Sequence, residues 1–316
     1  MMKVLVADKT DGVCAKVLAE RGLEPVVKTG MTPEQLRSCI AEYDAIIVRS
    51  DTTLTAELIE AAARLKAVAR AGSGVDNIDV PACLAKGVVV MNTPYGNTVS
   101  TAEHAVAMML ALARRIPQAN ASTHAGKWEE DGFEGVELTG KTLGVVGCGN
   151  VGSVVADRAA GLKMKVLLYS PSMTAGKASR LGGRMATLDE LYQESDFITY
   201  HVAMRDDTKG MLDKDAIAKM KRGVSIINCA RGGIAVGADV KEALLSGHIA
   251  GLACDVFVKE PATEHIFFGM ANVVCTPHIA ASTKDAQVTV ARQAAEQVAD
   301  YLLMGKKTHA IAAGKP

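Results

Sequence analysis

The chain is poor in aromatic side chains and has no excess of charge of either sign. Phe, Tyr and Trp make up only 4% of its 316 residues, so a folded core must be built from aliphatic side chains. Lys plus Arg equal Asp plus Glu at 35 each, and no basic block stands out. Chains that bind nucleic acid or a membrane surface carry a basic face, so neither partner is expected. The balanced composition favours a small-molecule ligand.

Long apolar runs and paired cysteines are also missing. No run reaches the roughly 18 apolar residues that a membrane-spanning helix requires. The N-terminal segment 3–7 has the pattern of a strand and lacks the features of a secretory leader. The seven cysteines show no C-x-x-C spacing and mostly lie within apolar segments, which indicates buried free thiols. We therefore expect a soluble protein of the reducing cytoplasm.

Short apolar strands alternate with amphipathic helices along the whole chain. That alternation predicts an α/β fold with parallel sheets covered by helices. A length of 316 residues exceeds one ordinary core, so two domains are expected. The expected strands fall into two series, one at 4–7, 45–48, 67–69 and 88–91, the other at 143–146, 165–169, 197–200, 225–228, 251–254 and 273–275.

Two long helices set the expected domain boundaries. A helix at 98–114 separates the two series and is expected to leave the first domain for the second. The second series holds about six strands, enough for a Rossmann-type doubly wound nucleotide domain. A helix at 283–303 has no strand of its own to cover, so it is expected to return to the first domain. The predicted domains are residues 1–97 with 283–316, and residues 98–282.

The most specific motif follows the first strand of the second series. Gly147, Gly149 and Gly152 form G-x-G-x-x-G between an apolar strand and a helix. The first glycine allows a tight turn, the second lets backbone amides approach a pyrophosphate, and the third lets the helix pack closely on the strand. The flanking strand and helix supply the context that a chance glycine cluster lacks. We therefore predict a dinucleotide site at this helix N-terminus.

Three further segments begin where an apolar strand ends, and they carry Arg231, Glu260 and His278. The carboxyl ends of strands in a doubly wound sheet border the ligand crevice, so these side chains are expected to converge. An imidazole can exchange a proton with a hydroxyl group, a carboxylate can orient the ring, and a guanidinium can hold a carboxylate bidentately. Each residue alone has an ordinary structural explanation, but together they predict an active site.

The order of these motifs resembles the D-isomer-specific 2-hydroxyacid dehydrogenases, and within them those that act on 3-phosphoglycerate. The resemblance implies a flavodoxin-like, discontinuous substrate domain beside the nucleotide domain, and a homodimer. It covers almost the whole chain and is carried by segments 48–50 (VRS), 70–77 (RAGSGVDN), 90–94 (VMNTP), 101–104 (TAEH), 126–128 (GKW), 138–143 (LTGKTL), 228–233 (NCARGG) and 272–278 (NVVCTPH).

The resemblance also implies a role for each site residue. His278 is the implied general acid/base, Glu260 its partner, and Arg231 the group that binds the substrate carboxylate and carbonyl oxygen. Asp255 is implied to orient the nicotinamide carboxamide, and a simple strand-end cap is the alternative. The other implied cofactor contacts are Gly147, Gly149, Asn150, Val151, Gly152, Ser170, His201, Thr208, Cys229 and Ala230. The other implied substrate contacts are Arg49, Ser50, Arg70, Ser73 and Gly74.

No metal site is expected. The pair Glu103-His104 lies inside a helix without a second histidine at metal-ligand spacing. We assign it to packing or to an interface.

Two departures from the family pattern bear on the ligands. Ser170 stands where an NAD-specific enzyme presents Asp or Glu to the ribose hydroxyls, and the nearest basic residues after it are Lys177 and Arg180. We therefore expect relaxed cofactor choice, with NAD favoured over NADP. Residues 129–131 are Glu-Glu-Asp where relatives often carry basic residues. These acids would oppose a substrate phosphate if they faced the site.

Together these features predict an NAD(P)-dependent oxidoreductase that interconverts a D-2-hydroxy acid and its 2-oxo acid by hydride transfer. The first expected reaction is 3-phosphoglycerate to 3-phosphohydroxypyruvate. Another small anionic acid, such as glycerate (with hydroxypyruvate) or sulfolactate, is the alternative substrate. A non-catalytic NAD(H)-sensing protein is the alternative of another class, because the same fold also serves transcriptional corepressors.

Overall fold

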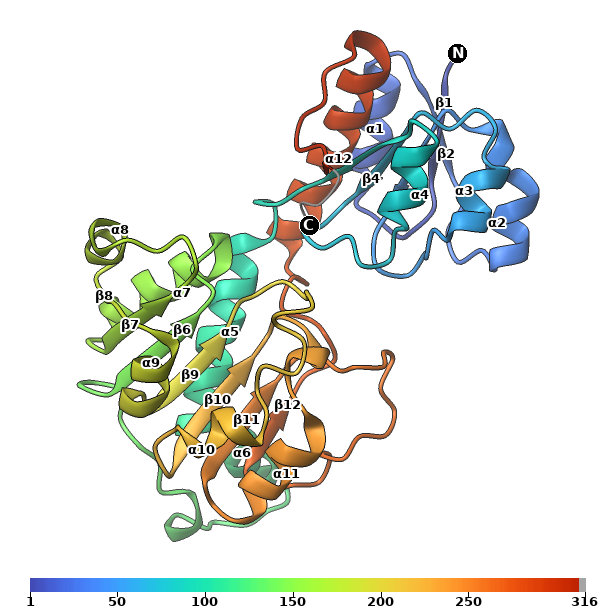
Figure 1. Cartoon of the computed structure of the whole chain (residues 1–316). Helices are drawn as coiled ribbons and strands as arrows, with labels where there is room; N and C mark the ends of the chain where they lie inside the picture. Colours follow the sequence, from blue (N-terminus) through green and yellow to red (C-terminus); the bar gives the residue numbers. More distant parts are fainter. Residues whose placement is uncertain (313–316) are drawn as a thin grey trace. The chain divides into compact units, whose positions relative to one another are not determined.

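The computed structural model describes residues 1–312, and the chain forms two compact units. Unit 1 contains residues 1–97 and the C-terminal segment from Ser282, and unit 2 contains residues 98–281. The chain therefore passes between the units twice, at 97/98 and at 281/282. Each unit is an α/β body with its own sheet, and each is described by itself (Figure 1).

Unit 1 is built on a five-stranded parallel sheet in the order β2-β1-β3-β4-β5, which is the strand order of flavodoxin-like folds. Both faces of the sheet are buried under aliphatic side chains: α1 and α12 cover one face, and α2, α3 and α4 cover the other. Its elements are β1 (Lys3–Val6), α1 (Val13–Glu20), β2 (Glu24–Val27), α2 (Pro33–Cys39), β3 (Ala45–Val48), α3 (Ala56–Ala61), β4 (Ala67–Arg70), α4 (Val80–Ala85), β5 (Val89–Asn92) and α12 (Lys284–Met304).

Unit 2 is built on a seven-stranded parallel sheet in the order β12-β11-β10-β9-β6-β7-β8. From β6 the chain first adds strands on one side and then on the other, so the switch point of the sheet lies between β6 and β9. Its elements are α5 (Thr98–Ala113), α6 (Ile116–His124), β6 (Thr142–Val146), α7 (Asn150–Gly161), β7 (Lys165–Tyr169), α8 (Ala175–Arg180), β8 (Arg184–Met185), α9 (Leu188–Glu194), β9 (Phe197–Tyr200), α10 (Lys214–Ala218), β10 (Val224–Asn228), α11 (Gly237–Leu245), β11 (Ile249–Cys254) and β12 (Val273–Cys275).

The α/β class and the doubly wound arrangement of unit 2 agree with the sequence analysis, but two edge strands escaped it. β2 contains Pro25 and pairs only with β1. Proline cannot donate to a ladder and is confined to such edges, so the sequence pattern of this strand is weak. β8 has two residues and pairs only with β7. The unit 2 sheet therefore has one strand more than expected.

In each unit, an aspartate links the amino ends of two neighbouring strands, β1 and β3 in unit 1 and β6 and β9 in unit 2. Asp44 precedes β3 and accepts the amide of Lys3, the first residue of β1, at 2.9 Å. Asp196 precedes β9 and accepts the amide of Thr142, the first residue of β6, at 2.8 Å. Burial opposes ionisation of both carboxyl groups, but the amides and a nearby lysine outweigh it and hold the pKa of each below its usual range. Each aspartate thus ties two strands together at the amino edge of its sheet.

Replacing Asp44 with Asn should lower the free energy of unfolding at neutral pH by about 1.5–3 kcal/mol, the usual contribution of hydrogen bonds to a charged group. The carboxylate's pKa is depressed in the folded state. Its stabilisation is therefore present above the unfolded-state pKa and is lost as the pH falls through the folded-state pKa. Urea midpoints of wild type and Asp44→Asn, measured from neutral pH into acid, should converge. A gap of constant size would contradict this assignment.

Candidate active site

The glycine loop joins β6 to α7 at the switch point of the unit 2 sheet. Gly147 has a φ of +94°, and a Cβ at this residue would lie 2.7 Å from the carbonyl oxygen of His201. A Cβ on Gly152 would lie 2.0 Å from the carbonyl oxygen of Gly147. Both positions therefore require glycine, the first for its backbone conformation and both for the close approach of neighbouring backbone.

The second glycine of the motif, Gly149, faces open space. No atom lies within 4 Å of the place that a Cβ would take, and no side chain caps α7 at this residue. The helix that begins with Asn150 and Val151 can therefore receive a phosphate, which its amides and its dipole favour. The loop fits the pyrophosphate of a dinucleotide.

Ser170 lies directly after β7, the strand next to β6, and is half-buried. Lys177 on α8 folds back onto this loop, where its Nζ donates to the carbonyl oxygen of Ser172 at 3.4 Å. Residues 170–177 contain no Asp or Glu. Segment 170–177 therefore contributes hydroxyl groups and an ammonium group to the end of β7, and no carboxylate.

The other predicted cofactor residues also follow strands at this carboxyl edge. His201 comes after β9; its Nε2 lies 2.8 Å from Thr199 Oγ1, and burial lowers the pKa of His201 to about 4, so the ring is neutral. Cys229 and Ala230 come after β10 and are buried. Thr208 lies in the loop after β9 and donates to the carbonyl oxygen of Ala203 at 2.6 Å.

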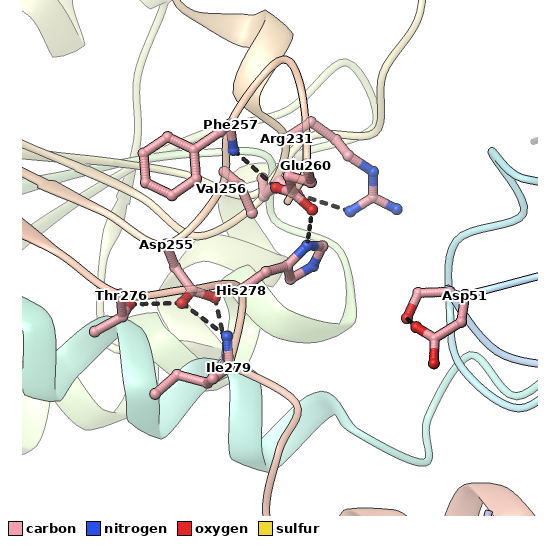
Figure 2. Close-up of polar contacts among 12 residues, drawn as sticks. Asp51, Arg231, Asp255, Val256, Phe257, Glu260, Thr276, His278 and Ile279 are labelled. Carbon is pink, nitrogen blue, oxygen red and sulfur yellow. Dashed lines mark hydrogen bonds and ion pairs between the residues drawn. The ribbon is translucent and has the colours of Figure 1, made fainter. Parts of the chain in front are cut away.

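The structure brings Glu260 and His278 together. His278 Nδ1 lies 2.6 Å from Glu260 Oε2, and Glu260 Oε1 accepts the amide of Phe257 at 2.8 Å (Figure 2). A carboxylate only accepts hydrogen bonds, so Nδ1 carries the proton and Nε2 is the nitrogen that can exchange one. The His278 side chain is 43% exposed. The ring is thus oriented from one side and accessible from the other.

Arg231 lies beside this pair in Figure 2, in the loop that follows β10. Gly232 lets that loop approach: a Cβ there would lie 2.1 Å from the carbonyl carbon of Phe257, in the segment that carries Glu260. Arg231 Nη1 donates to the carbonyl oxygen of Ala230 at 2.7 Å. A guanidinium, a carboxylate and an imidazole therefore meet at the ends of β10, β11 and β12.

Asp255 directly follows β11 and is fully buried. Its Oδ1 accepts the amide of Ile279 and its Oδ2 accepts the amide of Ala280, each at 2.9 Å, and the Thr276 hydroxyl donates to Oδ1 at 2.5 Å. Burial acts to raise the pKa of Asp255, but His104 and these donors outweigh it, and the pKa lies below its usual range. Both carboxylate oxygens of Asp255 accept hydrogen bonds from the segment after β12, as expected for a strand-end cap. A contact of Asp255 with the nicotinamide carboxamide stays a prediction.

The NAD binding domain of the D-isomer specific 2-hydroxyacid dehydrogenases matches residues 106–280 of this chain, a range that includes the glycine loop and all three side chains of the cluster. The chain belongs to this family. The chain is 48% identical to the D-3-phosphoglycerate dehydrogenase of Archaeoglobus fulgidus over 298 residues, which cover 94% of the chain and 56% of the relative. It is 42% identical to that of Bacillus subtilis over 308 residues, covering 95% and 57%. The chain thus spans about half the length of these curated relatives.

Solved structures resemble this chain over nearly their full length. A protein from Thermus thermophilus superposes with a TM-score of 0.90 at 30% identity, covering 98% of this chain and 100% of that one. The NAD⁺-bound 3-phosphoglycerate dehydrogenase of Entamoeba histolytica superposes with a TM-score of 0.84 at 28% identity, covering 98% of each chain. The fold predicted from the sequence is therefore confirmed.

The predicted substrate-binding residues of unit 1 lie at the carboxyl edge of its sheet. Asn77 holds the loops after β3 and β4 together, because its Nδ2 donates to the carbonyl oxygens of Arg49 at 2.7 Å and Thr52 at 2.6 Å. Asn92 Nδ2 donates to the carbonyl oxygen of Ser73 at 2.6 Å. These strand ends and loops carry Arg49, Ser50, Arg70, Ser73 and Gly74.

Three residues make contacts that the sequence analysis did not reveal. Asn77 and Thr276 were not singled out, although both lie in the motifs that carry the family resemblance. His104 was assigned to packing or an interface, and the structure adds a specific contact, because its Nε2 lies 3.1 Å from Thr276 Oγ1. The two residues are 172 positions apart, so only the fold reveals the contact.

Among residues 1–312, no group of three His, Cys, Asp or Glu side chains could hold a metal ion. No helix among those residues has both the length and the apolarity to cross a bilayer.

Proposed function

We propose that this dehydrogenase interconverts 3-phosphoglycerate and 3-phosphohydroxypyruvate with a nicotinamide dinucleotide. The observation that carries the proposal is the 2.6 Å contact between His278 and Glu260, beside Arg231 and at the same sheet edge as the glycine loop. The names of the curated relatives support the choice of 3-phosphoglycerate.

The chain supplies the proton transfer and the substrate contacts. When bound, NAD supplies the acceptor for the hydride that leaves C2 of the hydroxy acid. His278 Nε2 takes the hydroxyl proton, while Glu260 holds the opposite ring nitrogen and stabilises the imidazolium. Arg231 holds the substrate carboxylate through the paired donors of its guanidinium. In the reverse direction the imidazolium returns the proton to the carbonyl oxygen.

The acids after Trp128 have local partners. Glu129 accepts the hydroxyl of Ser122 at 2.6 Å, and Glu130 accepts the indole N–H of Trp128 at 2.6 Å. Lys127 lies 3.9 Å from Glu129. Two of the three acids at 129–131 are therefore engaged within their own segment. Their presence in the sequence is not by itself an argument against a phosphorylated substrate.

We further propose that NADP is accepted beside NAD, that the protein is a homodimer, and that it works in the cytoplasm. The serine and lysine at the end of β7 support the relaxed cofactor choice. The segment 116–136 exposes the apolar side chains of Ile116, Trp128 and Val136, which contact with a second copy would remove from water. All seven cysteines are free thiols, as a reducing compartment favours. Sedimentation equilibrium tests the dimer.

The function is tested by NADH formation with a panel of acids. Purified protein and NAD are mixed with 3-phosphoglycerate, D-glycerate or sulfolactate, and the absorbance of NADH is followed. The proposal expects the highest kcat/KM with 3-phosphoglycerate. A higher kcat/KM with another acid would identify that acid as the preferred substrate and leave the reaction class unchanged. NADH binding without turnover of any acid would support the NAD(H)-sensing alternative.

Glu260→Gln should move the acid limb of the kcat/KM profile for hydroxy-acid oxidation to lower pH. Gln preserves the shape of Glu260 but removes the charge that favours the imidazolium of His278, so the neutral ring persists further into acid. The maximal rate should also fall, because the imidazolium formed during turnover loses its anion. The measurement is a pH series of initial rates. A limb in the wild-type position would mean that Glu260 acts only through its contact with Phe257.

A further inference from the structure

The backbone at His278 has an unusual conformation. Its φ is +52°, in the left-handed region that only a few per cent of non-glycine residues adopt, with Asn, Asp and His the most frequent among them. Three successive amides around this turn are held by one residue: the His278 amide donates to the carbonyl oxygen of Asp255 at 2.8 Å, and the Ile279 and Ala280 amides donate to its carboxylate. A buried, ionised Asp255 is thus the anchor of the turn that presents His278.

Behind the Asp255 carboxylate lies a chain of hydrogen bonds that ends on α5. The Thr276 hydroxyl has one proton, and it donates this proton to Asp255 Oδ1 at 2.5 Å. Its oxygen must then accept from His104 Nε2, 3.1 Å away. His104 Nε2 also lies 3.5 Å from Asp255 Oδ1. The geometry therefore fixes the proton of His104 on Nε2 and aims it at this buried pair.

We propose that His104 is a positioning residue for His278, acting through Thr276 and Asp255, an inference that rests on the proposed function. Glu260 fixes the His278 ring through Nδ1, and the His104–Thr276–Asp255 brace fixes the backbone that carries the ring. The two constraints are independent, because one acts on the side chain from the β11–β12 loop and the other acts on the main chain from α5.

The brace connects two segments that lie at opposite ends of the unit 2 sequence. α5 begins at Thr98, where the chain enters unit 2, and the braced turn ends at Ala281, where the chain leaves it. The brace joins the entering helix to the leaving segment across the fully buried Asp255. Loss of His104 should therefore loosen the turn at His278 without disturbing the glycine loop, which lies at the end of β6.

The test combines amide hydrogen exchange in the ligand-free protein with steady-state kinetics. His104→Leu and the isosteric Thr276→Val each remove one link of the brace, and the two variants guard against a failure of either to fold. Exchange at the Ile279 and Ala280 amides should accelerate by at least about tenfold as the turn opens locally. The value of kcat should fall by about 10- to 100-fold from misplacement of the imidazole, a larger factor than any rise in the KM for NAD.

Two matched variants control the experiment. His104→Gln retains an N–H donor and should restore both slow exchange and most of kcat. Thr142→Val makes the same Thr-to-Val change at the amino end of β6, where the hydrogen bonds described for Thr142 run through its backbone, and it should leave both readouts at wild-type values.

Wild-type exchange at Ile279 and Ala280 in both His104→Leu and Thr276→Val would overturn the brace. Faster exchange with an unchanged kcat would overturn the positioning role. If wild type reduces NAD with none of the acids, the proposed function fails, and the exchange data still decide whether His104 holds the turn.

Discussion

His278→Ala is expected to lower kcat by about 10²- to 10⁴-fold, the usual contribution of a positioned general acid/base. The imidazole is the group whose Nε2 faces away from the Glu260 contact, so its removal leaves the substrate hydroxyl without a proton acceptor. The glycine loop lies after a different strand and does not depend on this side chain. The affinity for NADH, measured by its fluorescence, should therefore stay close to the wild-type value.

A histidine away from the site controls this experiment. His248 lies at the amino end of β11, the opposite end of the strand from the catalytic loop, and its Nε2 lies 3.2 Å from the carbonyl oxygen of Met220. His248→Ala should retain wild-type kcat, apart from any loss of stability seen in a melting curve. A His278→Ala variant with near wild-type turnover would remove His278 from the mechanism.

Ser170→Asp is expected to raise the ratio of kcat/KM with NAD to that with NADP by about tenfold to a hundredfold. The new carboxylate would accept from the ribose hydroxyls of NAD and repel the 2′-phosphate of NADP. Charged hydrogen bonds contribute roughly 1.5–3 kcal/mol, which corresponds to this range. Steady-state titrations with each cofactor, on wild type and variant, measure the ratio. Most of the change should come from weaker use of NADP.

Ser172→Asp is the matched control for the cofactor experiment. It adds the same charge two residues further along, in the exposed loop onto which Lys177 folds. Because it does not stand directly after β7, it should shift the ratio much less than Ser170→Asp. Equal shifts would show that overall charge, not contact with the ribose, determines the preference. If the NAD/NADP ratio of kcat/KM in Ser170→Asp equals that of wild type, the adenosine ribose does not contact position 170.

The parts of the site that sequence predicts well are those fixed by local geometry. Gly147 and Gly152 can be recognised in the sequence because a side chain at either position would collide with neighbouring backbone. Arg231 and His278 could be placed because each follows an apolar strand, and parallel strands of one sheet bring their carboxyl ends to the same edge. A pattern of strands and glycines thus carries most of the fold and the outline of the candidate site.

The parts that sequence could not predict depend on contacts between distant segments. The two possible roles of Asp255 look identical along the chain, and only the fold shows that both of its oxygens are engaged by the loop at 276–280. In the sequence, His104 is one residue of an ordinary amphipathic helix. Only the fold shows that it contacts Thr276, which follows β12. β2 has too little apolar pattern around Pro25 to be found without its partner β1.

The division of unit 1 into two stretches of sequence determines the order in which the protein can fold during synthesis. α12 covers one face of the unit 1 sheet, and Arg21 on the N-terminal side meets Asp300 at 2.8 Å across 279 positions. On the ribosome, the part of that aliphatic face that α12 covers must stay exposed, with only α1 in place, while all of unit 2 is made. Unit 2 is contiguous and can complete its core first. The nascent chain is therefore most prone to aggregation through the N-terminal stretch of unit 1, and that exposure ends only when α12 emerges.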